Sequence, residues 1–376
     1  MNLPIAETHR RPPADSSGLP IEVADQTSPR VPALVHLLDW DDAALKRWLN
    51  EAGEKPFRAK QIWANIFDRR CRDFESMTDL SKALRAKLAQ HFRILTATDE
   101  RVFQSRDGTD KLLVTWPGGG RVECVLLRDG HRRSICVSSQ VGCAMGCVFC
   151  ASGLDGVDRN LTRGEILEQM LRLQSRLADG QRLSHIVMMG MGEPLANLDN
   201  VLSALSVAKS EPGLGISPRR ITISTVGLPP AIDRLARHGV PYNLAVSLHA
   251  PDEELRNRLV PVNRKIGIDA VLAAADRYFD TTHRRLTFEY VLLGGINDGD
   301  DHARRLVSVL KRRSPMLNVI PYNRVDGLPY REPTRERIAA FKRILQSGGI
   351  NVQFRVQKGD EINAACGQLR RSMADA

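Results

Sequence analysis

The chain has 376 residues, enough for one or two domains with a large core, and its 26% charged and 42% hydrophobic residues are typical of a globular protein. Its 54 Lys and Arg outnumber its 44 Asp and Glu, and the net charge of +10 suits a polyanionic partner such as nucleic acid, although an ordinary basic surface has the same charge. We find no apolar run long enough to span a bilayer and no apolar secretion signal, so we expect a cytoplasmic protein without a membrane partner.

The first part of the chain changes character twice. Residues 1–32 are rich in Pro, Ser and Arg without periodicity and predict a disordered tail. Residues 33–95 have helical periodicity, as in "RAKQIWANIFDRR", and predict a small RNA-binding helical domain, although a basic helical face can also be merely solvated. The basic residues expected to contact RNA are Arg58, Lys60, Arg69, Arg70 and Arg72. Residues 96–132 alternate and carry turn signals, which predicts a β-hairpin linker of two or three antiparallel strands.

Strands and helices alternate over residues 133–357. The strand candidates are "RSICVSS", "LSHIVMMG", "RRITIST", "YNLAVSLHA", "RLTFEYVLL", "LNVIPYN" and "INVQFRV". Repeated βα units of this length predict a parallel sheet with helices outside, and six or seven of them predict a full or partial barrel. Ligand sites then lie at the C-terminal ends of the strands. Residues 358–376 are interpreted as a C-terminal tail.

Four of the seven cysteines lie in the segment "CVSSQVGCAMGCVFCASG". Thiols stay reduced in the cytoplasm, so this spacing indicates metal ligands or catalysts. Cys143, Cys147 and Cys150 follow the first barrel strand, and three thiolates are one short of a closed zinc site or an ordinary cubane. A [4Fe–4S] cluster on them keeps one iron open for a ligand with an amine and a carboxylate. The alternative is zinc, with Cys136 or His131 as the fourth ligand, but the second paired motif usual for zinc is missing.

Longer segments around these cysteines carry a specific resemblance. "RNLTRGEI", "MMGMGEPLANLDNV", "SLHAPDEELRNRLVPVN" and "GDEINAACGQL" follow in order, and "GEKPFRAKQIW" precedes them, so that agreement runs from about residue 37 to residue 369. On these segments the chain resembles the RlmN/Cfr family of radical SAM RNA adenosine methyltransferases. The resemblance implies an α/β fold: a partial (β/α)6 barrel of the radical SAM type with a small N-terminal helical domain and a short β linker. It also implies one [4Fe–4S] cluster and two molecules of S-adenosylmethionine (SAM) per turnover, as methyl donor and as radical source.

The resemblance further implies a reaction. Adenine C2 is electron-poor and a direct methyl transfer would fail there, so a radical route is needed. In the family, one SAM methylates a cysteine, a radical from a second SAM takes a hydrogen from that methyl group, and the carbon radical adds to the base. A second cysteine then releases the RNA by forming a disulfide. The implied substrates are an adenosine in the peptidyl-transferase region of 23S rRNA and the adenosine 3′ of the tRNA anticodon, with flavodoxin as the electron donor; a monomer is expected.

Carried over residue by residue, Cys366 matches the methyl-carrying cysteine, Cys136 the resolving cysteine and Glu123 the proton acceptor. The positions that match SAM contacts follow barrel strands: Gly192, Glu193, Ser224, Ser247, Leu248, His249 and Asn323. Cys71 and Cys124 are interpreted as structural. The chain departs from the family's usual arginine-rich run before Cys366, which leaves the RNA contacts open at Gln357, Lys358, Glu361 and Asn363.

Two alternatives remain at this stage. A Cfr-type enzyme that methylates adenine C8 shares the catalytic cysteines, so the motifs do not separate it from a C2 methyltransferase. A non-catalytic, metal-bearing RNA-binding protein is the alternative of another class, but it would need neither Cys366 nor the SAM-site segments.

Overall fold

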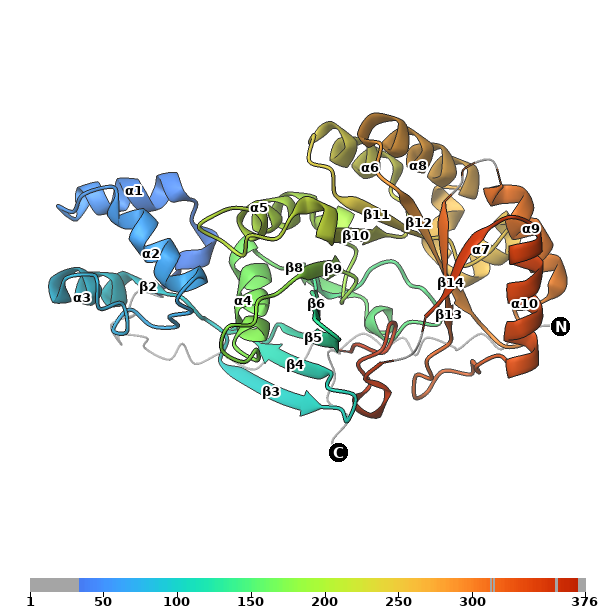
Figure 1. The fold of residues 1–376 in the computed structure, drawn as a ribbon, viewed down its shortest axis with the longest axis horizontal. Coiled ribbons are helices and arrows are strands. Elements are labelled where there is room, and N and C mark those ends of the chain that lie inside the picture. Colours follow the sequence, from blue (N-terminus) through green and yellow to red (C-terminus); the bar gives the residue numbers. More distant parts are fainter. Residues whose placement is uncertain (1–33, 312, 314, 356–357, 371–376) are drawn as a thin grey trace, which may run out of the picture. The chain divides into compact units, whose positions relative to one another are not determined.

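The computed structural model describes residues 34–311, 313, 315–355 and 358–370, and the tail predicted for residues 1–32 lies outside them. From Leu34 onward the chain forms one compact unit around a ten-stranded sheet (Figure 1). Seven neighbouring strands of this sheet are parallel: β6 (Arg132–Cys136), β9 (His185–Met188), β10 (Ile221–Thr225), β11 (Asn243–Ser247), β12 (Leu286–Leu292), β13 (Met316–Pro321) and β14 (Asn351–Phe354).

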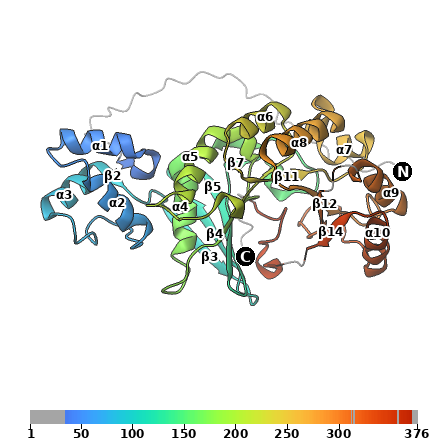
Figure 2. The same ribbon diagram turned by 45° about the horizontal axis from the view of Figure 1, so that its top comes forward.

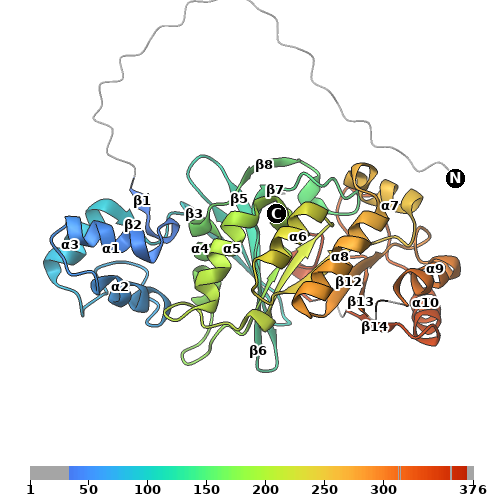
Figure 3. The same ribbon diagram turned by 90° about the horizontal axis from the view of Figure 1, so that it is seen from above.

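Helices connect each parallel strand to the next. They are α4 (Arg163–Gln174), α5 (Leu198–Lys209), α6 (Pro229–Arg237), α7 (Glu253–Leu259), α8 (Ile268–Thr282), α9 (Asp300–Leu310) and α10 (Arg335–Ser347). Figure 3 shows α4 beside α5 and α6 beside α8 along one side of the sheet. The chain thus makes six βα units and ends the series with β14, while β14 and β3 form the two open edges. The predicted α/β partial barrel is confirmed. None of the described helices is long and apolar enough to cross a membrane.

The parallel strands read as apolar runs because both of their faces are covered. In β12 six of the seven positions are buried, and its Tyr290 ring packs against Phe341 of α10 at a centroid distance of 5.7 Å. A strand covered on both faces cannot alternate between apolar and polar residues as a surface strand does. Glu289 of β12 is therefore an exception, because it is a charged residue within a strand that is covered on both faces.

The strands predicted as a linker extend the same sheet instead of separating two domains. They are β3 (Asp99–Gln104), β4 (Asp110–Thr115) and β5 (Arg121–Asp129), and β5 pairs antiparallel with β6, Val125 opposite Cys136. Figure 2 shows β3 and β4 continuing from β5. Two short strands were not predicted, β7 (Gln140–Gly142) and β8 (Val157–Asn160), which pair on either side of the cysteine loop.

The N-terminal region is helical, as the periodicity predicts. It contains α1 (Asp42–Glu51), α2 (Arg58–Phe67) and α3 (Lys82–His91), and the two-residue strands β1 (Val35–His36) and β2 (Phe92–Arg93) pair in parallel. Asp41 and Ser81 cap α1 and α3 by accepting hydrogen bonds from Ala44 N and Leu84 N.

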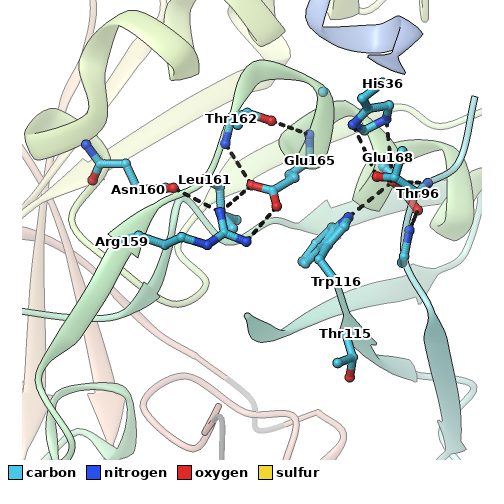
Figure 4. Close-up of polar contacts among 12 residues, drawn as sticks. His36, Thr96, Thr115, Trp116, Arg159, Asn160, Leu161, Thr162, Glu165 and Glu168 are labelled. Carbon is cyan, nitrogen blue, oxygen red and sulfur yellow. Dashed lines mark hydrogen bonds and ion pairs between the residues drawn. The ribbon is translucent and has the colours of Figure 1, made fainter. Parts of the chain in front are cut away.

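A buried carboxylate on α4 joins this helical region to the sheet (Figure 4). Glu168 has no exposed surface and accepts hydrogen bonds from Thr96 N (2.9 Å), Ala97 N (3.0 Å) and Trp116 Nε1 (3.2 Å). Arg172 pairs with Glu168 at 2.8 Å, and His36 Nε2 lies 3.5 Å away. Burial alone would raise the pKa of Glu168, but these backbone donors and cations hold it below its ordinary value.

The start of the same helix is fixed by the predicted capping box. Thr162 and Glu165 exchange side-chain to backbone hydrogen bonds, and Arg159 of β8 makes two 2.7 Å bonds to the Glu165 carboxylate (Figure 4).

Arg72 is wrongly predicted as an RNA contact. Its guanidinium turns inward and donates to Leu171 O (3.1 Å), Gln174 Oε1 (3.0 Å) and Ser175 Oγ (3.1 Å) at the end of α4. Burial lowers the pKa of Arg72 to about 10. Because the side chain is committed to these acceptors, it ties the helical region to the barrel and is not available to a phosphate.

Candidate active site

A cavity of about 150 Å³ lies where the parallel strands end. Its lining brings together nine of the thirteen predicted site residues: Cys143, Cys147, Cys150, Gly192, Glu193, Ser224, Ser247, His249 and Cys366. Leu248, Asn323, Cys136 and Glu123 are not in the lining. Segments up to 223 residues apart in sequence therefore meet at one edge of the sheet, as the barrel prediction requires.

Backbone hydrogen bonds to distant segments hold the cysteine loop. Cys143 N donates to Gly156 O (2.8 Å), Val148 N to Leu259 O (3.1 Å) and Ala151 N to Gly367 O (2.8 Å). Burial raises the pKa of Cys143 to about 12, and it also raises the pKa values of Cys147 and Cys150. These thiols keep their protons unless a metal centre displaces them, so they are suited to metal binding and poorly suited to act as free nucleophiles.

The donor set fits an iron–sulfur cluster better than a closed zinc site. In the part of the chain that the structure describes, no three His, Cys, Asp or Glu side chains converge on one metal ion. A cubane is bound through separate iron atoms, so its thiolates need not meet at one point. The candidate fourth zinc ligands are elsewhere: His131 is exposed before the start of β6, and Cys136 lies outside the cavity lining. Three thiols leave one iron of a cubane open.

Gly192 and Glu193 follow β9 in a tight loop against Gln140. A Cβ on Gly192 would lie 2.7 Å from the backbone nitrogen of Gln140, and its φ of 97° also requires glycine. Glu193 is buried and accepts hydrogen bonds from Val226 N (2.8 Å) and Leu195 N (3.0 Å). Burial raises the pKa of Glu193 to about 7, which a ligand cation such as an ammonium group would reverse.

His249 is a neutral, fixed histidine. It has a φ of 58°, its Nδ1 accepts a hydrogen bond from Val291 N (3.1 Å), and its ring meets Phe149 edge to face at 4.9 Å. Burial, with Arg256 as a smaller contribution, lowers the pKa of His249 to about 3. The neighbouring Leu248 has no exposed surface, and its backbone N donates to Glu289 O (3.0 Å) while its carbonyl accepts from Arg256 Nε (3.1 Å), so Leu248 is not available to a ligand.

The C-terminal segment places Cys366 at the cavity. Asn323 Nδ2 donates to Cys366 O (2.9 Å), and Ser152 Oγ donates to Leu369 O (2.7 Å). Asn323 is thus in contact with the tail. Cys136, at the end of β6, is buried, and this burial, followed by the nearby Cys366, raises the pKa of Cys136 to about 12.

Glu123 is buried, whereas an ordinary carboxylate on a surface strand would be exposed. Its Oε1 pairs with Lys111 Nζ at 2.7 Å, and its Oε2 accepts a hydrogen bond from Arg370 N at 2.8 Å. Burial raises the pKa of Glu123 although Lys111 and these hydrogen bonds oppose the change.

The residues that depart from the usual family pattern dock the tail onto the hairpin strands. Lys358 Nζ lies 3.2 Å from Asp129, Glu361 Oε2 accepts from Arg106 N (3.3 Å), and Asn363 O accepts from Lys111 Nζ (3.4 Å). Gln357 lies outside the described residues.

Sequence reasoning missed two charged residues here. Glu289 of β12 is 4% exposed and lines the cavity, and the signal that could have found it is an acidic residue inside an apolar strand. Arg256 of α7 has no exposed surface and donates to the carbonyls of Leu248 (3.1 Å) and Ser247 (3.0 Å), which fixes the loop after β11. Its helical spacing in "EELRNRL" gave no such signal.

Comparisons with known proteins agree with this geometry. Residues 35–94 match the ribosomal RNA large subunit methyltransferase N-terminal domain, and residues 137–307 match the radical SAM superfamily. A crystal structure of a radical SAM methyltransferase from Sphaerobacter thermophilus superposes with a TM-score of 0.87 at 43% identity, covering 89% of this chain and 99% of that chain. The barrel with its three-cysteine loop is that of a radical SAM enzyme.

Two curated relatives define the family more narrowly. A probable dual-specificity RNA methyltransferase RlmN of Rhodopirellula baltica is 69% identical over 95% of this chain and 96% of its own length. A protein of the same description from Desulforamulus reducens is 45% identical over 90% and 96%. The chain belongs to the RlmN family of RNA methyltransferases.

Proposed function

We propose that the protein methylates C2 of one adenosine in the peptidyl-transferase region of 23S rRNA and C2 of the adenosine 3′ of the anticodon in tRNA. The observation that carries this proposal is the docking of the Cys366 segment onto a cavity that also contains three metal-binding cysteines. A protein that only bound RNA would have no use for a cysteine held there. Because the proposed substrates are ribosomal and transfer RNA, we also propose a cytoplasmic location.

In this proposal Cys143, Cys147 and Cys150 hold one [4Fe–4S] cluster. When bound, such a cluster supplies the electron that cleaves SAM reductively, and flavodoxin is the proposed donor. Glu193 would hold the ammonium group of SAM, and the Gly192 backbone would let the ligand approach closely. Ser224, Ser247 and His249 complete the pocket, and Leu248 lies outside its lining. Asn323 is assigned to the tail, whose carbonyl it holds.

The two remaining cysteines act in order. Cys366 accepts a methyl group from the first SAM, and two molecules of SAM are used per turnover. After the methyl carbon has joined the base, Cys136 attacks Cys366, the carbon–sulfur bond to the product breaks, and a Cys136–Cys366 disulfide remains. Burial raises the pKa of Cys136 to about 12, so this thiol stays protonated and does not compete with Cys366 for the methyl group of the first SAM.

Glu123 is the proposed proton acceptor for adenine C2. A raised pKa brings a carboxylate closer to the operating pH, where a general base is most effective. Lys111 and Arg370 N each bind one of its oxygens, and each carboxylate oxygen has a second lone pair that can take the proton.

Mass spectrometry of nucleosides tests the function. Purified, cluster-loaded protein would be incubated with SAM, a reductant, and either 23S rRNA or tRNA transcripts, with Cys366→Ala as the control. We expect 2-methyladenosine in both RNAs and none with the control. Exclusive formation of 8-methyladenosine would replace the proposal with the Cfr-type activity, and RNA binding without any methylation would favour the non-catalytic alternative.

A further inference from the structure

The proposed function requires Cys366 to react as a thiolate, because the thiolate is the nucleophilic form of cysteine. A free cysteine with a pKa of about 8.5 is mostly protonated at neutral pH, and the thiol is a poor nucleophile. Methyl transfer forms a bond between the Cys366 sulfur and the SAM methyl carbon and breaks the bond from that carbon to the sulfonium sulfur. The electron pair stays on that sulfur, S-adenosylhomocysteine leaves, and the thiol proton must already have gone to solvent.

Arg355 is positioned to favour the thiolate. It follows the last residue of β14, and its backbone N donates to Val319 O (2.9 Å), which continues the ladder between β13 and β14 by one residue. Its Nη1 lies 3.8 Å from Cys366 Sγ. Among the described residues, Arg355 is the cationic side chain that contacts this sulfur.

Cys366 is also held from the other side of its peptide. Asn323 Nδ2 binds its carbonyl oxygen, and Ala151 N binds the carbonyl of the next residue, Gly367. The backbones of Arg355 and Cys366 are therefore anchored independently, one by the sheet and the other by the barrel loops. Only the two side chains have to be ordered when the thiolate forms, and the planar guanidinium loses little freedom in doing so.

Several charged and titratable groups lie around Arg355 and Cys366. Cys136 of β6 and Cys150 of the cysteine loop lie near Cys366, and Glu289 of β12 acts on Arg355 from within the cavity. Burial opposes the charge of Arg355, but a guanidinium keeps its proton at neutral pH and Glu289 helps to raise the pKa of Arg355, so it stays cationic. Glu289 Oε1 accepts from Asn318 Nδ2 (3.0 Å), while its buried Oε2 has no hydrogen-bond partner among the described residues.

We propose that Arg355 activates Cys366 for methyl transfer by holding its sulfur as the thiolate. This assignment rests on the proposed function and adds a residue to it. It also explains why the two catalytic cysteines differ. Cys366 touches a guanidinium and reacts first, whereas Cys136 is buried without such a contact among the described residues and reacts second.

The test measures the reactivity of each cysteine directly. Full-length, cluster-loaded protein would be treated with iodoacetamide under anaerobic conditions from pH 6 to pH 9.5, and peptide mass spectrometry would follow the labelling of unmethylated Cys366. Arg355→Met removes the charge and keeps much of the volume, and Arg355→Lys retains the charge. Arg324→Met is the matched control, because Arg324 is exposed near the tail and its carbonyl, rather than its side chain, binds Gln368.

For Arg355→Met we expect labelling of Cys366 at pH 7 to slow about tenfold, which corresponds to about 1.4 kcal/mol, and to approach the wild-type rate above pH 9. Arg355→Lys should recover most of the rate, and Arg324→Met should match the wild type. An unchanged profile in Arg355→Met, or a loss of equal size at every pH, would overturn the inference, because the second result is that of altered access.

Failure of the inference and failure of the proposed function give different results. If the wild type methylates RNA while Arg355→Met keeps the wild-type labelling profile, only the role of Arg355 is wrong. If the labelling profile shifts as expected but the wild type methylates no RNA, the thiolate contact stands and the proposed function is wrong. Iron content of each variant, measured in parallel, shows that the cluster is retained.

Discussion

The contacts of Glu168 between the helical region and the sheet allow a prediction about the stability of the fold, independent of catalysis. Glu168→Ala removes an acceptor that has no exposed surface and serves Thr96 N, Ala97 N, Trp116 Nε1 and Arg172. Breaking a buried ion pair by removing one partner costs about 3–5 kcal/mol, and each buried donor left without an acceptor adds to the loss. Arg172 keeps a second partner in Glu100, which limits the damage. We therefore expect about 4 kcal/mol of destabilisation.

Thermal unfolding followed by circular dichroism measures this effect. With about 2–4 °C per kcal/mol for a domain of this size, the midpoint should fall by roughly 8–16 °C. The matched control is Asp199→Ala, which breaks an exposed ion pair with Arg234 and should cost no more than about 0.5 kcal/mol. A midpoint for Glu168→Ala within about 2 °C of the wild type would refute the view that this carboxylate joins the helical region to the barrel.

The pH dependence has a definite sign. The folded-state pKa of Glu168 is depressed, so its contribution to stability is fully present above the unfolded value of about 4.3 and is lost as the pH falls through the folded pKa. The difference in unfolding midpoint between wild type and Glu168→Ala should accordingly be constant near neutral pH and shrink below about pH 4. A difference that grows on acidification would contradict the assignment.

Further predictions concern the cluster, the two cysteines and the RNA surface. Anaerobically purified protein should lose its brown colour and its iron in each of three variants, Cys143→Ala, Cys147→Ala and Cys150→Ala. Cys136→Ala should keep both, and loss of colour in Cys136→Ala would favour the alternative of a four-ligand zinc site. Cys136→Ala, expressed in cells, should purify with RNA that survives denaturation, and Cys366→Ala and the double variant should not; RNA-free Cys136→Ala would exclude the two-cysteine mechanism. Charge reversal at Arg58 or Lys60 should flatten the salt dependence of RNA binding by a slope of roughly 0.7–0.9 per lost phosphate contact. Arg72→Ala should destabilise the protein instead, because its donors are bound to α4.

The barrel could be predicted because its signals are local. Each parallel strand is a short apolar run followed by a helical pattern, and the sheet follows from the repetition of that unit. Placing Ser224, Ser247 and Cys143 in one cavity needed only the rule that parallel strands end at the same edge.

What could not be predicted depends on pairing between distant segments. The orientation of Arg72 is set by acceptors about 100 residues later, and nothing in "DRRCRDF" distinguishes it from the exposed Arg69. The same holds for Lys358 and Glu361, which pair with the β3–β6 strands and their turns. Periodicity tells which face of an element is buried, but it does not tell which charged partner lies on the other side.

The way the tail is anchored bears on how one sulfur can serve several steps. In the proposed reaction Cys366 must meet the SAM methyl group, then the base, and finally Cys136. The contacts of Asn323 and Ala151 are with the carbonyls of Cys366 and Gly367, so they restrain the backbone and do not involve the Cys366 side chain. Arg355 contacts the sulfur of Cys366, and in the proposed reaction methylation would weaken that contact because the sulfur then carries no negative charge. An anchored backbone with a releasable side chain lets the cysteine change partners without the tail leaving the barrel.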